Sequence, residues 1–395
     1  MNGKNPWKSR AARFVAAQAV SLFGSSLVQY AIIWHITLTT SSGKMLAIST
    51  LCGFLPQLAV SVFGGVWADR FSRKSLIMLA DGAVAAATLA LALSMGLGYR
   101  EMWLMFGVLA VRSAGTGFQT PAVQAFLPQI VPKEKLMRVG GVQSSVNSAI
   151  TFLSPALGGA LLSLYPLETV LLVDIVTAIV GISLTAGIKA GEQKRDAAVS
   201  GWKSLQEGFA YARQNRVLRN LLAFQVLTMF LISPSAFLTP LLVERAFGGE
   251  VWRLTASEMT YSAGMVLGGA LIAAWGGFSK KLRTTLLAGG IYGLLMLGLG
   301  LSPVFLGYLA CNLLIGATSP CYNTPMNVYL QENTAPEMQG RVFGLMQAVS
   351  SCALPLGMAL FGPLADIVPI SVLFVVCGIP TAGTAAFTFR RRLLD

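Results

Sequence analysis

The segment Gly65-Val66-Trp67-Ala68-Asp69-Arg70-Phe71-Ser72-Arg73-Lys74 joins two apolar stretches, 43–68 and 75–97. Each stretch has the ~20 residues that an α-helix needs to cross the hydrocarbon core of a bilayer. One acid and three bases crowd into this junction, although only 11% of the 395 residues are charged. The segment is therefore predicted to be a tight polar loop between two transmembrane helices.

The composition of the whole chain favours a membrane protein. Hydrophobic residues make up 54% of the sequence and charged residues 11%, whereas a soluble domain has about 25% charged residues. We therefore predict an all-α integral membrane protein with twelve transmembrane helices. On either side of the polar loop, the apolar stretches lie at 13–38, 43–68, 75–97, 102–122, 137–164, 168–188, 217–243, 255–276, 284–301, 304–330, 340–365 and 369–389.

The basic residues are distributed unequally between alternate connections. The even-numbered connections and the two tails hold 24 of the 29 Lys and Arg residues, and the odd-numbered connections hold four. Because loops rich in Lys and Arg stay in the cytoplasm, this asymmetry predicts a multi-pass protein of the plasma membrane with both termini cytoplasmic. It also accounts for the net charge of +13 without nucleic-acid binding.

Several sequence features recur at an offset of 200 to 204 residues. Thr120-Pro121 recurs as Thr324-Pro325, and Pro155 recurs as Pro355. An ordered repeat of this kind predicts two pseudo-symmetric six-helix halves, an arrangement found in transporters that hold a substrate near the midplane of the membrane. The other repeated features are Pro132 with Pro336, Arg138-Val139 with Arg341-Val342, and Gly141 with Gly344.

The longest polar segment, 189–216, separates the predicted halves. It sets the boundaries of a first half at 1–188 and a second half at 217–395. Its apolar residues fall on one helical face, which predicts an amphipathic helix on the cytoplasmic surface; a simple tether is the alternative. These residues are Trp202, Leu205, Phe209 and Ala212.

Several kinds of site lack the residues that they need. The single histidine, His35, excludes a multi-histidine metal site and argues against a Ser-His-Asp triad. The five cysteines lie in apolar stretches without CxxC spacing, so we interpret them as small buried side chains. No phosphate-binding loop for ATP is present. We expect no metal, no cofactor and no enzymatic activity; a membrane enzyme or a sensor is the alternative from another class.

Charged residues inside the predicted spans are candidates for ion coupling. They are Asp81, Arg112 and Asp174. Because a charge in hydrocarbon is costly, such residues tend to face cavities and to carry protons or cations. We predict this role for the two acids. As alternatives, Asp81 pairs only with Arg73 or Lys74 below it, and Arg112 is a structural arginine bound to helix-end carbonyls.

Amide side chains are also frequent within the spans. They predict a polar, weakly charged cavity for a bulky, weakly basic molecule. The alternative is that they form hydrogen bonds between helices. The predicted cavity residues are Gln18, Gln29, Gln119, Asn147, Gln225, Asn323 and Asn327.

The polar loop resembles the signature loop of the major facilitator superfamily, GxLaDrxGrk, with Ser72 in place of the second glycine and Trp67 in place of leucine. We interpret it as a cytoplasmic latch. Asp69 accepts backbone N–H bonds at a neighbouring helix start, and the bases bind acids or lipid phosphates. Ordinary positive-inside charge is the alternative. The latch residues are Gly65, Asp69, Arg70, Arg73 and Lys74.

Two other segments are similar to motifs of the same family. Arg112, followed by Gly115 and Gly117, resembles RxxxGxG with the glycines one residue early; the arginine of that motif is linked to proton transfer in the family. A segment of the fifth span resembles the GPxxGG motif of antiporters, in which proline bends the helix and glycines allow close packing. A generic kinked packing helix is the alternative. The antiporter-motif residues are Gly141, Pro155, Gly158 and Gly159.

Over nearly its whole length, the chain is similar to the macrolide-efflux branch of the drug:proton antiporters. Similar segments include 18–25, 53–56, 120–122 and 340–343. The resemblance implies proton-driven export of hydrophobic or amphiphilic, macrolide-like antibiotics across a bacterial inner membrane. It implies a monomer that works by alternating access without a cofactor. A siderophore or metabolite exporter of the same superfamily is the alternative.

Overall fold

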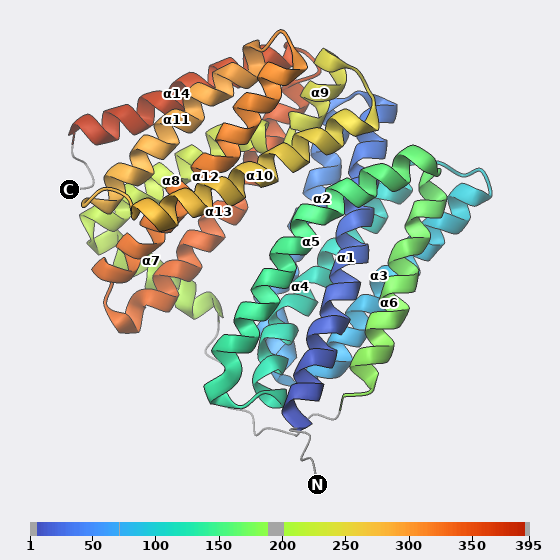
Figure 1. Ribbon diagram of the computed structural model, residues 1–395. Helices are drawn as coiled ribbons and strands as arrows, with labels where there is room; N and C mark the ends of the chain where they lie inside the picture. Colours follow the sequence, from blue (N-terminus) through green and yellow to red (C-terminus); the bar gives the residue numbers. More distant parts are fainter. Residues whose placement is uncertain (1–5, 71, 189–200, 392–395) are drawn as a thin grey trace. The chain divides into compact units, whose positions relative to one another are not determined.

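The computed structural model describes residues 6–70, 72–188 and 201–391, except the side chains of 6, 62–70, 201–205, 336–337 and 390–391. The described chain is helical and contains no strand (Figure 1). The helices are α1 Pro6–Thr40, α2 Gly43–Arg70, α3 Arg73–Gly96, α4 Met102–Ile130, the 3-10 helix η1 Lys133–Lys135, α5 Leu136–Leu164, α6 Leu167–Ala186, α7 Gly201–Gln214, α8 Arg216–Phe237, α9 Thr239–Phe247, α10 Val251–Trp275, α11 Lys281–Leu301, α12 Phe305–Asn333, α13 Pro336–Leu364 and α14 Ile370–Arg391.

The helices confirm the predicted all-α fold with twelve spans in two six-helix halves. The first six stretches are α1–α6, and the other six are α8 with α9, followed by α10–α14. Nine helices in the described part of the chain are long and apolar enough to cross a membrane. The remaining three spans, α4, α10 and α12, have 29, 25 and 29 residues. The repeat is visible in α5 and α13, which both have 29 residues and an internal proline, Pro155 or Pro355.

The seventh span is two helices rather than the single helix predicted for 217–243. The first, α8, ends at Phe237, and α9 begins at Thr239 with Pro240 in its first turn. A proline lacks the backbone N–H, and its ring clashes with the carbonyl of the preceding turn. A continuous helix is therefore disfavoured at this point. In transporters, discontinuous spans often line the substrate site.

The contacts divide the chain into two compact units, which are described separately. The first unit comprises Met1–Ile36 and Cys52–Ser200, and the second comprises Thr37–Leu51 and Gly201–Asp395. In the first unit, α3 packs against α4 and α6. In the second, α11 packs against α12 and α14, α10 against α12, and α8 against α13. The end of α1 and the start of α2 thus belong to the second unit.

Asp366, just after α13, fixes the start of α2 within the second unit. Its carboxylate accepts hydrogen bonds from the backbone N–H groups of Gly43 at 2.7 Å and Lys44 at 2.9 Å. Arg245 Nη2 donates to the same carboxylate at 2.8 Å. Partial burial alone would raise the pKa of Asp366, but these hydrogen bonds and one from Ser42 lower it below its ordinary value.

Small residues bring α10 and α12 into close contact. A Cβ atom added to Gly264 would lie 2.0 Å from the carbonyl oxygen of Leu313, and one on Gly268 would lie 2.1 Å from that of Ala317. Neither position has room for a larger side chain, so the two backbones touch as they do in small-xxx-small membrane packing.

Within the second unit, α7, from the segment that joins the predicted halves in sequence, packs against α13 and α8. Ala212 is buried, and Glu207 Oε2 lies 2.9 Å from Arg341 Nε. Phe209, which was predicted to share the apolar face with Ala212, is 59% exposed. Only part of the predicted face therefore contacts the protein. Trp202 and Leu205 lie outside the described side chains.

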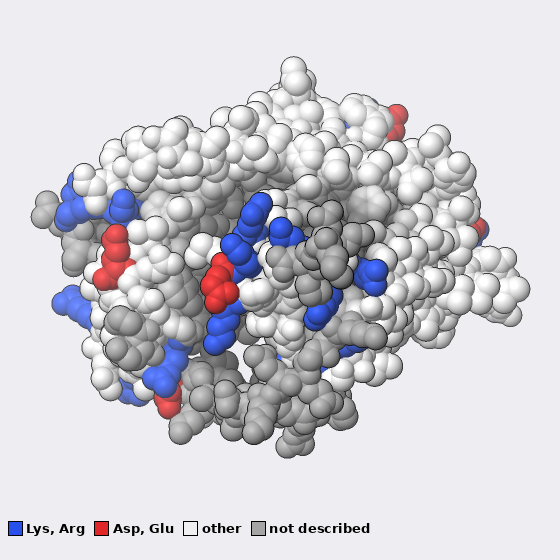
Figure 2. Space-filling model, turned by 60° about the horizontal axis from the view of Figure 1, so that its bottom comes forward, with Lys and Arg blue, Asp and Glu red and all other residues white. Residues whose placement is uncertain are grey.

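Basic side chains gather at the end of the first unit where α1 begins. Lys133, Lys135 and Arg138, in and just after the connection between α4 and α5, are all exposed. Figure 2 brings this end forward, and lysine and arginine predominate over aspartate and glutamate on the visible face.

Candidate functional site

The first unit contains a polar cavity of ≈ 410 Å³, lined by residues of α1 to α5. Its two ionisable lining side chains have opposite charges, and the others are mainly amides and hydroxyls. Six of the residues predicted from the sequence line it: Gln18, Gln29, Asp81, Arg112, Gln119 and Asn147.

Arg112 of α4 forms a buried ion pair with Asp174 of α6. Arg112 Nη1 donates to Asp174 Oδ2, and the two side chains are 5% and 2% exposed. Ser25 and Thr88 each donate a hydroxyl hydrogen bond to Asp174 at 2.9 Å. Both charges are thus neutralised and hydrogen-bonded, as buried charges generally need to be.

The rest of the arginine is also held by the first helix. Arg112 Nη2 donates to the backbone carbonyl of Ser25 at 2.7 Å, and Nε donates to Gln29 Oε1 at 3.4 Å. The alternative predicted for Arg112 was a structural arginine bound to helix-end carbonyls. Arg112 does bind a backbone carbonyl, but that of Ser25, which lies in the middle of α1 and not at a helix end.

Asp81 of α3 has hydrogen-bond partners but no ion pair among the described residues. Its Oδ1 accepts from Ser21 Oγ at 2.7 Å and from Gln119 Nε2 at 2.9 Å. The predicted alternative, a pair with Arg73 or Lys74, is therefore wrong. Lys74 lies two helical turns, about 10 Å, from Asp81 along α3. Its Nζ instead donates to the backbone carbonyls of Ala186 at 2.5 Å and Ile188 at 3.0 Å.

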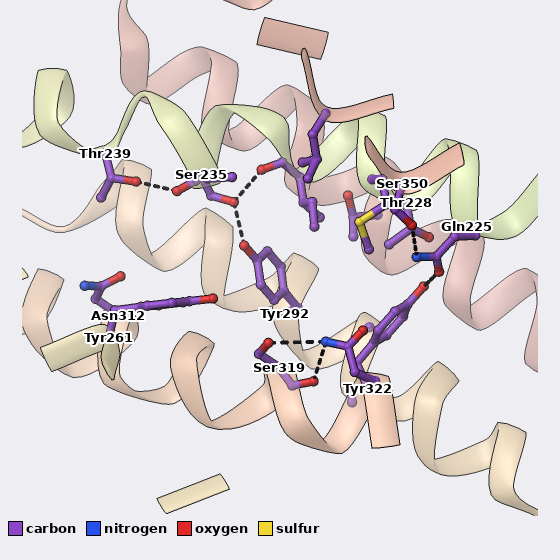
Figure 3. Close-up of a pocket in the computed structure, with 18 of the residues that line it drawn as sticks. Gln225, Thr228, Ser235, Thr239, Tyr261, Tyr292, Asn312, Ser319, Tyr322 and Ser350 are labelled. Carbon is purple, nitrogen blue, oxygen red and sulfur yellow. Dashed lines mark hydrogen bonds between the residues drawn. The ribbon is translucent and has the colours of Figure 1, made fainter. Parts of the chain in front are cut away.

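The second unit contains its own cavity of ≈ 390 Å³, in which three helices each place a tyrosine (Figure 3). These are Tyr261 of α10, Tyr292 of α11 and Tyr322 of α12. Tyr292 Oη lies 2.8 Å from Ser235 Oγ, and Tyr322 Oη donates to Gln225 Oε1 at 2.7 Å. These bonds occupy the hydroxyls of Tyr292 and Tyr322, so those two rings form fixed walls.

The predicted amides of the second half are only partly brought together. Gln225 and Asn323 line the tyrosine-rich cavity. Gln225 Nε2 also donates to Ser350 Oγ at 3.0 Å. Asn327 is exposed and lines neither of these two cavities.

Glu258 also lines the second cavity, although no sequence pattern had singled it out. The apolar stretch was expected to begin at 255, which places an acid at 258 near its edge. In the structure α10 already begins at Val251, so Glu258 lies two turns inside the helix. An earlier predicted start for this helix, at 251 instead of 255, would have identified Glu258 as an acid inside the span.

The antiporter-motif residues lie on α5, where Pro155 is inside the helix. A Cβ atom on Gly158 would lie 3.2 Å from the carbonyl oxygen of Leu27 on α1, so this glycine permits close approach. Gly159 is buried. A Cβ atom on Gly141 would meet nothing within 4 Å, so the expected close packing does not explain that glycine.

The latch lies mostly outside the described side chains. Gly65, Asp69 and Arg70 belong to the segment 62–71, whose side chains are not described. Of the other two latch residues, Arg73 is half-buried, and Lys74 ties the start of α3 to the end of α6 through the carbonyl contacts given above.

Comparison with known proteins places this geometry in a family. The model of the Major Facilitator Superfamily matches residues 14–357. Macrolide efflux protein A of Streptococcus pyogenes is 32% identical over 384 residues, which cover 96% of this chain and 95% of that protein. The staphyloferrin A transporter of Staphylococcus aureus is 22% identical and covers 96% of both chains.

Solved structures agree on the fold. The crystal structure of the nucleoside transporter NupG superposes with a TM-score of 0.69 over 98% of each chain, at 13% sequence identity. At that identity the likeness concerns the fold alone.

Proposed function

Because this chain belongs to the major facilitator superfamily of membrane transporters, we propose that it exports hydrophobic or amphiphilic, macrolide-like compounds in exchange for protons, by alternating access. The observation that carries the proposal is the pair of polar, weakly charged cavities, one in each unit. Such cavities offer apolar area and scattered hydrogen bonds to a bulky, weakly basic molecule. The relation to macrolide efflux protein A supports the same substrate class.

Proton coupling is assigned to the charged residues of the first cavity. Asp81 faces the cavity and accepts only neutral hydrogen bonds, so a proton on its carboxylate removes an uncompensated charge. A neutral Asp81 can then be enclosed at lower cost during the change of access. The Arg112–Asp174 ion pair supplies two further charges beside it. Asp174 is the second carboxylate of this unit to which a proton can be added.

The moving parts are proposed to be the two halves, 1–188 and 217–395, joined by 189–216. The signature loop, with Asp69 at its centre, restrains them at the cytoplasmic face. Both halves lie in one chain, so a monomer suffices.

We propose that the protein lies in a bacterial inner membrane with both termini in the cytoplasm. The excess of Lys and Arg in the tails and even-numbered connections supports this orientation, and the relatives named above are bacterial. The resemblance of the segment around Pro155 to the antiporter motif supports export rather than uptake.

Accumulation assays test the proposal. Production of the protein in a pump-deficient bacterium should lower the accumulation of an erythromycin-like macrolide, and a protonophore should restore it. The siderophore alternative, which the staphyloferrin A relative favours, predicts no macrolide effect and a faster release of an iron chelator from the producing cells. Unchanged macrolide accumulation, with the protein verified in the membrane, would overturn the drug assignment.

A further inference from the structure

Glu258 is an acid for which the described residues around it provide no counter-charge. It lies seven residues into α10 and is partly exposed to the cavity of the second unit. Within the described part of the chain, its carboxylate has no hydrogen bond and no ion pair, and no charged side chain acts on it. No Lys, Arg or His is among the described residues that line the cavity. Acids in the membrane interior usually have a partner, so this one points to a partner that arrives from outside.

The two acids of the first unit differ from Glu258 in this respect. Asp174 is neutralised by Arg112, and Asp81 accepts two hydrogen bonds from Ser21 and Gln119. Glu258 is the acid in a described cavity for which neither a counter-charge nor a hydrogen-bond donor is provided. A cationic ligand would supply the missing charge.

The aromatic walls around the acid favour the same kind of ligand. Tyr261, one turn beyond Glu258 on α10, faces the cavity with Tyr292 and Tyr322 (Figure 3). Glu258 lies close enough to Tyr261 and Tyr308 to interact with them electrostatically. The faces of aromatic rings attract organic cations, and the attraction is stronger where water is excluded. A carboxylate among tyrosine rings is therefore suited to a substituted ammonium group.

We infer that Glu258 and the tyrosines of this cavity bind the protonated amino group of the exported amphiphile, so that the preferred substrates are bulky hydrophobic amines. The inference rests on the proposed export function and names its substrate class. The cavity of ≈ 390 Å³ is within the range of small-molecule sites and is large enough for an amine-bearing portion of a large ligand.

Direct binding to the purified full-length protein tests this inference. The two probes are erythromycin, which carries a protonated tertiary amine, and its N-demethyl-N-acetyl derivative, which is neutral and of similar size. The wild type should bind erythromycin at least about tenfold more tightly than the neutral derivative, a difference of about 1.4 kcal/mol. Glu258→Gln should abolish this preference, and an unchanged helical circular dichroism spectrum verifies that the variant is folded.

Two matched variants complete the design. Glu258→Asp keeps the charge and should keep most of the preference for the amine. Glu332→Gln removes an exposed carboxylate on α12 that lines neither cavity, and it should bind both probes as the wild type does. A wild type without preference for the amine, or a Glu258→Gln variant that retains it, would overturn the inference.

The outcomes separate the inference from the export function. If the charge preference depends on Glu258 but cells show no export, the amine site stands and the proposed transport of macrolides fails. If cells export erythromycin and Glu258→Gln keeps the charge preference, export stands and the amine site fails.

Discussion

Replacement of Arg112 by methionine should destabilise the protein strongly, because it leaves Asp174 charged and buried without its counter-charge. The two side chains are 5% and 2% exposed, so water cannot take over the lost interaction. Removal of one partner from a buried ion pair costs about 3–5 kcal/mol in the free energy of unfolding. Ser25 and Thr88 still donate to Asp174, which favours the lower part of that range.

The exposed pair between Arg100 and Glu168 provides a matched control in the same unit. These side chains are 3.1 Å apart and 61% and 23% exposed. Exposed pairs contribute about 0–1 kcal/mol, so Arg100→Met should lower the unfolding free energy by less than about 1 kcal/mol. The difference between the losses of unfolding free energy in Arg112→Met and Arg100→Met isolates the effect of burial, because both variants lose an arginine.

A double-mutant cycle identifies the partner. Arg112→Met combined with Asp174→Leu replaces the whole pair by apolar side chains, and such replacements are often neutral or stabilising. The double variant should therefore be more stable than either single variant. Equilibrium unfolding in mixed detergent micelles, followed by the helical circular dichroism signal, measures all the variants. The ion pair would be refuted if Arg112→Met cost no more than Arg100→Met, or if the two effects simply added.

Three further substitutions test proton coupling, the latch and the hydrogen bonds of Asp366 to the start of α2. Asp81→Asn should abolish uptake driven by a pH gradient in inverted vesicles but leave downhill exchange, since a neutral amide cannot cycle a proton; retained gradient-driven uptake would move the carrier elsewhere. Asp69→Asn should leave the amount of protein in the membrane unchanged and strongly reduce export, whereas wild-type export would contradict the latch. Because the pKa of Asp366 is lowered in the folded protein, its contribution to stability is present above its unfolded pKa of about 3.9 and is lost as the pH falls through the folded pKa. Asp366→Asn should therefore lower the melting temperature at pH 7, and the difference from the wild type should shrink below about pH 4; a difference that does not depend on pH would exclude the carboxylate as its cause.

The sequence by itself determined the class of the fold and much of its plan. A segment of about 20 apolar residues favours a helix across the bilayer largely independently of its neighbours, so the spans could be located one at a time. Even the polar loop around Asp69 sufficed to indicate the family, because its charges and glycine lie within ten consecutive residues. Local information fails at the seventh span only where Pro240 divides it.

The tertiary structure alone decided how the intramembrane charges are used. Arg112 lies 62 residues from Asp174 along the chain and 31 from Asp81, yet it pairs with the more distant acid. The amides, expected to form one cavity, are divided between the two units. Glu258 gained its significance only when the structure placed it in a cavity lined by tyrosines of three helices. The physical reason is that an electrostatic interaction depends on the distance between side chains, and that distance is set by the rotation and packing of helices, which no single segment encodes.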